Sequence, residues 1–171
     1  MTKEKAISPL QRSLNVWAII LIVWSFYRFK FQLPEWFDEL VAKPLVFVVP
    51  VYYYITHFEK RSFLEAVWFD RKKVLSDLIS ALGIGVLFII AALLANYVND
   101  RVFPALPANI GLIVLLSLAT GITEEILSRG FLLKKLYEDS KNIYIASLNG
   151  SILFFVLHIP ILFTNPKYTL L

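Results

Sequence analysis

Long apolar runs alternate with short polar and charged segments along most of this chain. A helix needs about 20 mainly apolar residues to cross a hydrocarbon core about 30 Å thick. Five stretches qualify, and they cover residues 14–30, 41–56, 74–98, 110–125 and 143–163. Pro50 interrupts the second stretch and predicts a kink there. The pattern therefore predicts an all-α, polytopic membrane protein with a bundle of about five transmembrane helices.

The composition indicates that lipid is the solvent of these helices. Hydrophobic residues make up 58% of the chain and charged residues 18%, and a soluble fold could not hide that much apolar surface. The net charge is +4, but the cations sit between apolar runs rather than along one solvated face. We therefore expect no nucleic acid as a partner. The chain has no cysteine, which excludes disulfides and thiolate metal sites.

The distribution of Lys and Arg predicts the orientation in the membrane, because cytoplasmic loops retain positive charge. Basic residues concentrate in segments 3–12, 60–73 and 134–141, and the opposite face receives fewer, among them Arg28 and Lys43. We expect the amino terminus to be cytoplasmic, in a multi-pass protein of the plasma membrane. The first run lacks a small-x-small cleavage site, so we expect a retained span rather than a signal peptide. We expect one membrane domain over residues 1–171.

Two adjacent carboxylates, Glu124 and Glu125, lie inside an apolar sequence. A charge within a span costs about 3 kcal/mol even on a mild insertion scale, so the pair requires an explanation. On a helix Glu125 and Arg129 share a face and can form an ion pair, whereas Glu124 lacks that partner and can accept a proton. This division predicts a general base at Glu124. Alternatively, both acids sit at the cytoplasmic end of the helix and either snorkel to the interface or pair with solvent-exposed Lys134 and Lys135.

His158 is embedded in the apolar sequence of the fifth stretch. An intramembrane histidine is a candidate functional residue, and Phe154, four residues earlier, can hold the ring by packing on the same helix face. Alternatively, the imidazole bonds to a backbone carbonyl that Pro160 leaves free. The helical rise puts Glu124 about 15 Å and His158 about 25 Å from the loop between their helices. A shared site therefore requires a helix tilt, a kink at Pro160 or a loop that dips before Ile143.

The pattern Glu124-Glu125-x-x-x-Arg129 followed by Phe154-x-x-x-His158 resembles the first two motifs of the CPBP family of intramembrane proteases. This family includes CAAX prenyl endopeptidases and bacteriocin-processing or self-immunity proteins. The resemblance implies a catalytic core within residues 108–163. The family's further His-x-x-x-Asn or His-x-x-x-Asp motif does not occur before the end of this sequence. We therefore expect either a chain truncated ahead of that motif or a member without activity.

The resemblance implies hydrolysis of a peptide bond within the membrane. Glu124 would activate a water and His158 would stabilise the oxyanion, with Glu125, Arg129 and Phe154 in supporting roles. The partners would be membrane lipid and a membrane-anchored or lipidated peptide substrate. One histidine and two carboxylates could hold zinc, but no second intramembrane histidine completes an ordinary zinc set. We therefore expect no metal and no other cofactor.

Two other classes of function stay open from the residues alone. A catalytically inactive binding or immunity protein of the same fold would keep the membrane helices and use their cavity as a partner site. A small transporter would use the intramembrane acids and the histidine as a proton relay.

Overall fold

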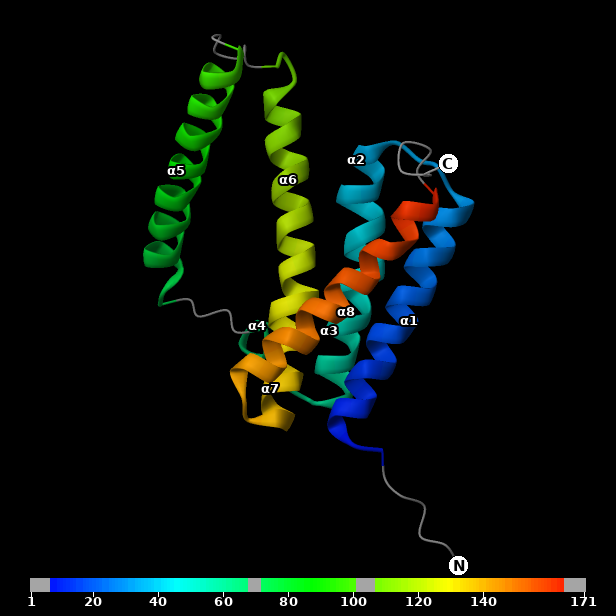
Figure 1. Ribbon diagram of the computed structural model, residues 1–171. Helices are drawn as coiled ribbons and strands as arrows, with labels where there is room; N and C mark the ends of the chain where they lie inside the picture. The colour runs from blue at the N-terminus through cyan, green and yellow to red at the C-terminus, as the bar shows by residue number, and fades with distance from the viewer. Residues whose placement is uncertain (1–6, 68–71, 101–106, 165–171) are drawn as a thin grey trace, which may run out of the picture. The chain divides into compact units, whose positions relative to one another are not determined.

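Figure 1 shows the computed structural model of the chain, which describes residues 7–67, 72–100 and 107–164. Every regular element in these ranges is helical. Five helical stretches are long and apolar enough to cross a membrane: Pro9–Lys30, Glu35–Phe58, Val74–Asn99, Ile110–Ser140 and Ile143–Ile161. The predicted all-α fold with five spans is confirmed, and the chain is an integral membrane protein.

The chain divides into two compact units, and the candidate site lies within the first. The first unit comprises Met1–Trp68 and Leu115–Leu171, and the second comprises Phe69–Val114. The second unit contains α5 (Val74–Asp100), an uninterrupted apolar helix, and the start of α6 (Ile110–Glu125). The basic segments that predict the orientation extend outside the described residues, at 1–6 and 68–71. A single membrane domain over the whole chain stays a prediction.

The first span, α1 (Pro9–Lys30), starts earlier than its apolar run because the preceding residues cap it. The Ser8 hydroxyl accepts a hydrogen bond from the Gln11 N–H at 3.1 Å, and Pro9 is a first helical residue that needs no acceptor. Arg28 and Lys30 occupy the last turn, where positive charge complements the helix dipole. The apolar run therefore marks only the lipid-embedded part of this helix.

The second span changes its winding several times. It runs through α2 (Glu35–Phe37), η1 (Asp38–Ala42), η2 (Pro44–Val48), α3 (Val49–Tyr53) and η3 (Tyr54–Phe58), where η marks π-helical turns. Pro44 and Pro50 lack the N–H that would continue an α-helical ladder, and the winding changes beside both of them. The interruption predicted at Pro50 therefore takes the form of a change from π to α winding.

A core of buried aromatic and aliphatic side chains joins the helices of the first unit. Its members come from α1, the second span, η4 (Ile126–Leu133) and α8 (Ile143–Thr164): Trp17, Ile20, Trp24, Phe47, Val51, Tyr54, Ile55, Leu127, Phe131, Leu132 and Leu157. Trp24 packs edge-on against Phe47 with ring centroids 5.0 Å apart, and Tyr54 packs against Phe131 at 5.7 Å. α1 and α8 lie side by side (Figure 1). These contacts hold the helices that line the candidate site.

The fourth span continues well past the acid pair. After α6 it runs through η4 and α7 (Lys134–Ser140), which ends where Lys141 adopts a left-handed conformation with φ 54°. Lys134 and Lys135 lie at the start of α7 and are only 6% and 8% exposed. The prediction that these two lysines face solvent is therefore wrong.

Both buried lysines contact groups of the first unit other than Glu124 and Glu125. The Lys134 ammonium donates to the Ala66 carbonyl at 2.7 Å, in the short helix α4 (Phe63–Ala66). The Lys135 ammonium pairs with Glu59 at 2.6 Å. Because these groups satisfy the lysines, the alternative in which the lysines neutralise the acid pair is also wrong.

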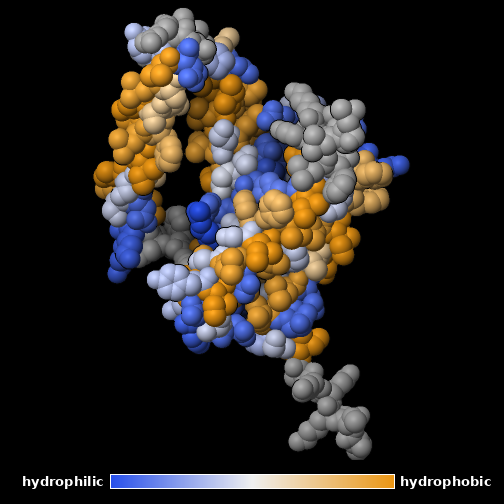
Figure 2. All heavy atoms as spheres, viewed as in Figure 1, coloured by the Kyte–Doolittle hydropathy of each residue, from blue (hydrophilic) through white to orange (hydrophobic). Residues whose placement is uncertain are grey.

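The surface of the first unit agrees with a membrane environment. Figure 2 shows hydrophobic residues over α1 and α8 and hydrophilic residues around the end that holds α7. Ile19, Ile22 and Phe26 on α1 are 58%, 67% and 64% exposed. Large apolar side chains with that exposure suit contact with lipid tails rather than water.

Candidate active site

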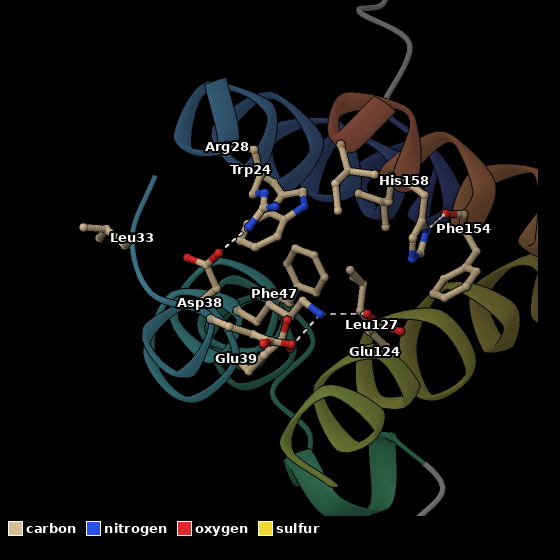
Figure 3. A pocket seen from close by; sticks show the side chains of 14 residues that line it. Trp24, Arg28, Leu33, Asp38, Glu39, Phe47, Glu124, Leu127, Phe154 and His158 are labelled. Carbon is tan, nitrogen blue, oxygen red and sulfur yellow. Dashed lines mark hydrogen bonds and ion pairs between the residues drawn. The ribbon is translucent and has the colours of Figure 1, made fainter. Parts of the chain in front are cut away.

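A cavity of about 480 Å³ lies within the first unit and is lined by α1, the second span, the fourth span and α8. Its charged and polar lining residues are Arg28, Glu35, Asp38, Glu39, Lys43, Glu124 and His158. Its apolar lining residues are Trp24, Leu33, Phe47, Leu127, Phe154, Leu157 and Ile161. Figure 3 shows this mixed lining from close by. Apolar walls with a few converging charged groups are typical of binding and catalytic sites.

Glu124 lies in the last turn of α6, and its side chain is 20% exposed. Its Oε1 accepts a hydrogen bond from the Lys43 ammonium at 3.0 Å, across 81 positions of sequence. The two residues form an ion pair between the second span and α6. Glu124 lacks Arg129 as a partner, as the spacing predicts, because Arg129 pairs with Glu125. Its cationic partner is Lys43 of the second span, which the spacing on one helix does not reveal.

The Lys43 ammonium is shared between two carboxylates. It lies 2.7 Å from Glu39 Oε2 and 3.0 Å from Glu124 Oε1. The Thr120 hydroxyl, one turn before Glu124 on α6, hydrogen bonds to the same Glu39 oxygen. Glu39 and Lys43 lie four positions apart on the second span. They therefore contact Thr120 and Glu124, which lie four positions apart on α6. This arrangement fixes the two helices to each other at the cavity wall.

A second buried ion pair lines the same cavity. The Arg28 guanidinium pairs with Asp38, and the Tyr27 hydroxyl donates to the other Asp38 oxygen at 2.5 Å. Arg28 also lies over the Trp24 ring, 5.7 Å from its centroid, in a cation–π arrangement. The distribution of basic residues predicts Arg28 and Lys43 as cations of one membrane face, whereas the structure shows both lining the cavity.

His158 reaches the cavity from α8, and Figure 3 shows its ring directed into this space. Its Nδ1 lies 2.9 Å from the Phe154 carbonyl oxygen. Because a carbonyl only accepts hydrogen bonds, Nδ1 carries the hydrogen, and Nε2 is the ring nitrogen left for other partners. The Phe154 ring packs beside the imidazole with centroids 4.6 Å apart. Phe154 thus orients the histidine through both its backbone and its side chain.

The carbonyl bonded to His158 is not the one that the proline leaves free. Pro160 cannot donate to the carbonyl four residues before it, at Val156, whereas the imidazole bonds to the carbonyl of Phe154. This is the usual contact of a side chain with the carbonyl one turn back along its own helix. The partner predicted from Pro160 is therefore wrong.

Glu124 and His158 line one cavity despite their unequal distances from the loop between their helices. In Figure 1, α8 runs obliquely, inclined to the fourth span. An inclined helix covers less height per residue than an upright one. The tilt therefore reduces the depth difference that the helical rise predicts.

Glu125 and Arg129 form an ion pair at the spacing that predicts one, with Arg129 Nη1 2.6 Å from Glu125 Oε1. Their side chains are 51% and 72% exposed, and neither lines the cavity of Glu124. They border a separate hollow of about 370 Å³, together with Ser128, Leu133, Ser147, Gly150, Ser151 and Phe154. The two adjacent acids therefore face different surroundings, and Phe154 borders both spaces.

The described residues contain no group of three carboxylate or imidazole side chains placed to hold a metal ion. A reaction without a resident metal stays a prediction.

Residues 104–171 match the family model described as type II CAAX prenyl endopeptidase Rce1-like. No curated protein and no solved structure matches the chain. The matched part contains both motifs of the sequence analysis, from Glu124 to Arg129 and from Phe154 to His158. The match confirms the family resemblance that those motifs carry, and it covers the fourth and fifth spans.

Proposed function

We propose that this chain, whose residues 104–171 belong to the type II CAAX prenyl endopeptidase Rce1-like family, cleaves a peptide bond of a membrane-anchored or lipidated substrate. The family is one of proteases. The observation that carries the proposal is the shared cavity, because Glu124 and His158 come from different spans and line the same space of about 480 Å³. A carboxylate and an imidazole that face one cavity can act on a single substrate.

Glu124 is the general base of the proposed reaction. It takes a proton from a water molecule, and the water oxygen attacks the carbonyl carbon of the scissile bond, which moves negative charge to the carbonyl oxygen. The proton on Glu124 then passes to the amide nitrogen, the carbon–nitrogen bond breaks, and the acid and amine products leave. Position supports this assignment, since Glu124 lines the cavity and the adjacent Glu125 does not.

The proposed role of His158 follows from its two ring nitrogens. With Nδ1–H bonded to the Phe154 carbonyl, a neutral ring presents Nε2 as an acceptor, which suits it to orient the attacking water. Stabilising an oxyanion, the role that the resemblance implies, requires a second hydrogen on Nε2. We therefore assign water orientation to the neutral ring and oxyanion stabilisation to the imidazolium.

The proposed substrate enters the cavity with an apolar part. Trp24, Phe47 and Leu157 supply apolar walls beside the charged groups, and these walls suit a lipidated or apolar peptide better than a polar one. The proposed reaction uses no resident metal. The proposed location is the plasma membrane. The proposed orientation has the amino terminus in the cytoplasm, which the basic segments 60–73 and 134–141 support.

Cleavage of an internally quenched, prenylated CAAX peptide by the protein in proteoliposomes tests the proposal. Glu124→Gln keeps the size of the side chain and removes the base, so we expect the cleavage rate to fall about 100-fold or more. Glu125→Gln makes the same change one residue further on, outside the cavity. We expect its loss to be about tenfold smaller than that of Glu124→Gln. His158→Ala should lose activity to a similar extent as Glu124→Gln.

Two results would contradict the proposed reaction. Cleavage by Glu124→Gln at the wild-type rate would remove the general base from the mechanism. Wild-type and Glu124→Gln proteins that bind the prenylated peptide equally tightly and cleave nothing would identify a noncatalytic binding protein instead.

A further inference from the structure

Lys43 is an ammonium group within a membrane span, and the residue is only 9% exposed. A lysine buried at that depth is costly unless a partner compensates its charge. Glu39, four residues earlier and 2.7 Å away, is already such a partner on the same helix. The burial of Lys43 alone therefore does not explain its additional contact with Glu124 at 3.0 Å.

A π-helical turn brings Lys43 to this position. The Lys43 N–H donates to the Asp38 carbonyl five residues earlier, rather than to a carbonyl four residues earlier as in an α-helix. Asp38, Glu39 and Lys43 all line the cavity from this turn. π-Turns within α-helices occur frequently at functional sites, and here the turn presents a cation to the proposed base.

The other charged and titratable groups that line the cavity with Lys43 come from several elements. They are Arg28 from α1, Glu35 from α2, Asp38 and Glu39 from η1, Glu124 from α6 and His158 from α8. Arg28 pairs with Asp38, whereas Lys43 contacts both Glu39 and Glu124. Without Lys43, these two carboxylates would face one cavity as like charges with no cation between them.

We infer that Lys43 is a positioning residue for Glu124. Lys43 holds the Glu124 carboxylate at the cavity wall and compensates its negative charge until Glu124 takes the proton from the water. The inference rests on the proposed function, because it assigns a partner to the proposed base. When the proton passes from water to Glu124, negative charge moves to the carbonyl oxygen of the substrate. The ammonium already lies at the cavity, so it lowers the energy of that charge without a rearrangement.

A purely structural ion pair would behave differently. Its loss would lower the stability of the protein and leave kcat unchanged in the molecules that stay folded. A positioning role predicts a change at Glu124 itself, and it predicts rescue by Lys43→Arg, which keeps the positive charge.

Dicyclohexylcarbodiimide modifies protonated carboxyl groups in membranes and therefore tests the state of Glu124 without a substrate. The carbodiimide nitrogen takes the carboxyl proton, the carboxylate oxygen adds to the central carbon, and mass spectrometry locates the adduct. At neutral pH we expect Glu124 labelling to be low in the wild type and in Lys43→Arg, and about tenfold higher or more in Lys43→Met. Glu39→Gln keeps Lys43 beside Glu124 and should resemble the wild type.

A second variant covers the case in which Lys43→Met does not fold. Lys43→Met/Glu39→Gln removes both partners together and avoids two facing like charges, and Glu124 labelling should rise there as well. In the cleavage assay, kcat should fall about tenfold or more in Lys43→Met with KM within about threefold of the wild type. Lys43→Arg should recover most of that loss.

The two assays separate failure of the inference from failure of the proposed function. Equal labelling of Glu124 in the wild type and in folded Lys43→Met or the double variant would overturn the role of Lys43, even if the peptide is cleaved. The expected labelling pattern without any cleavage would support the role of Lys43 and count against the protease.

Discussion

Gly130 is a position at which the fourth span has no room for a side chain. A Cβ added there would lie 2.9 Å from Val67 Cβ and 3.3 Å from both Val67 Cγ1 and the Val67 carbonyl oxygen. Carbon atoms in favourable contact lie about 3.5–4.0 Å apart. Because Val67 Cβ and its carbonyl are fixed to the backbone, a rotamer change cannot relieve the overlap. Gly130→Ala therefore requires the backbone after α4 to move away from η4.

Two effects of opposite sign determine the stability of Gly130→Ala. Overpacking of a filled interior costs about 1–3 kcal/mol, and replacing a helical glycine by alanine contributes about 1 kcal/mol of stabilisation. Gly150→Ala in α8 is a matched control, because its Cβ would meet Leu133 and Leu136 at 3.8 Å, an ordinary contact. The helix-propensity gain is common to both substitutions. Their difference in the free energy of unfolding therefore isolates the overlap with Val67, about 1–3 kcal/mol.

Thermal unfolding in detergent micelles measures this difference. About 1 kcal/mol corresponds to roughly 2–4 °C for a chain of this length, so Gly130→Ala should melt several degrees below Gly150→Ala. In a Val67→Gly background, which lacks the overlapping Cβ, Gly130→Ala should cost much less. In a Val67→Ala background, which keeps that Cβ, the cost should persist. Equal melting temperatures for Gly130→Ala and Gly150→Ala would refute the packing argument.

Two further predictions concern the cofactor and the orientation. Incubation with EDTA or phenanthroline should leave peptide cleavage in proteoliposomes unchanged, because the proposed base acts without a metal; a loss of activity that zinc restores would contradict this. The chain has no cysteine, so a single introduced cysteine is a unique label site. With the amino terminus in the cytoplasm, an impermeant maleimide added to intact cells should label Gln32→Cys in the exposed segment after α1 and spare Asp139→Cys near the end of α7. The reverse pattern would invert the proposed orientation.

The sequence predicts the number of spans well, because a chain that crosses lipid must satisfy its backbone hydrogen bonds internally. A helix does so, and it needs a minimum length of apolar residues to cross. It predicts α5 closely, as residues 74–98 against Val74–Asp100 in the structure. It misplaces the start of the second span, at residue 41 instead of Glu35. Asp38 and Glu39 enter that helix because cations in the fold compensate them. A hydropathy pattern does not reveal such partners.

The contacts of the candidate site also fall into two kinds: contacts within one helix, which the sequence predicts, and contacts between helices, which it does not. Contacts between residues four apart follow from helix geometry, and the structure contains Arg129 with Glu125 and His158 with Phe154. The contact of Lys43 with Glu124 joins different spans and has no such spacing. A local signal for Lys43 does exist, since Glu39 precedes it by four residues within a span, where a lone charge would be costly.

Arg28 and Lys43 are weak signals of membrane orientation, because carboxylates in the cavity compensate both charges. Lys134 and Lys135 are buried as well, on the face predicted to be cytoplasmic. When all four are set aside, the exposed cations of the described residues on that face are Arg12, Lys60, Arg61, Lys72, Lys73 and Lys141. On the opposite face the described residues retain Lys30 as an exposed cation. The charge asymmetry that supports a cytoplasmic amino terminus therefore does not depend on these four compensated or buried residues.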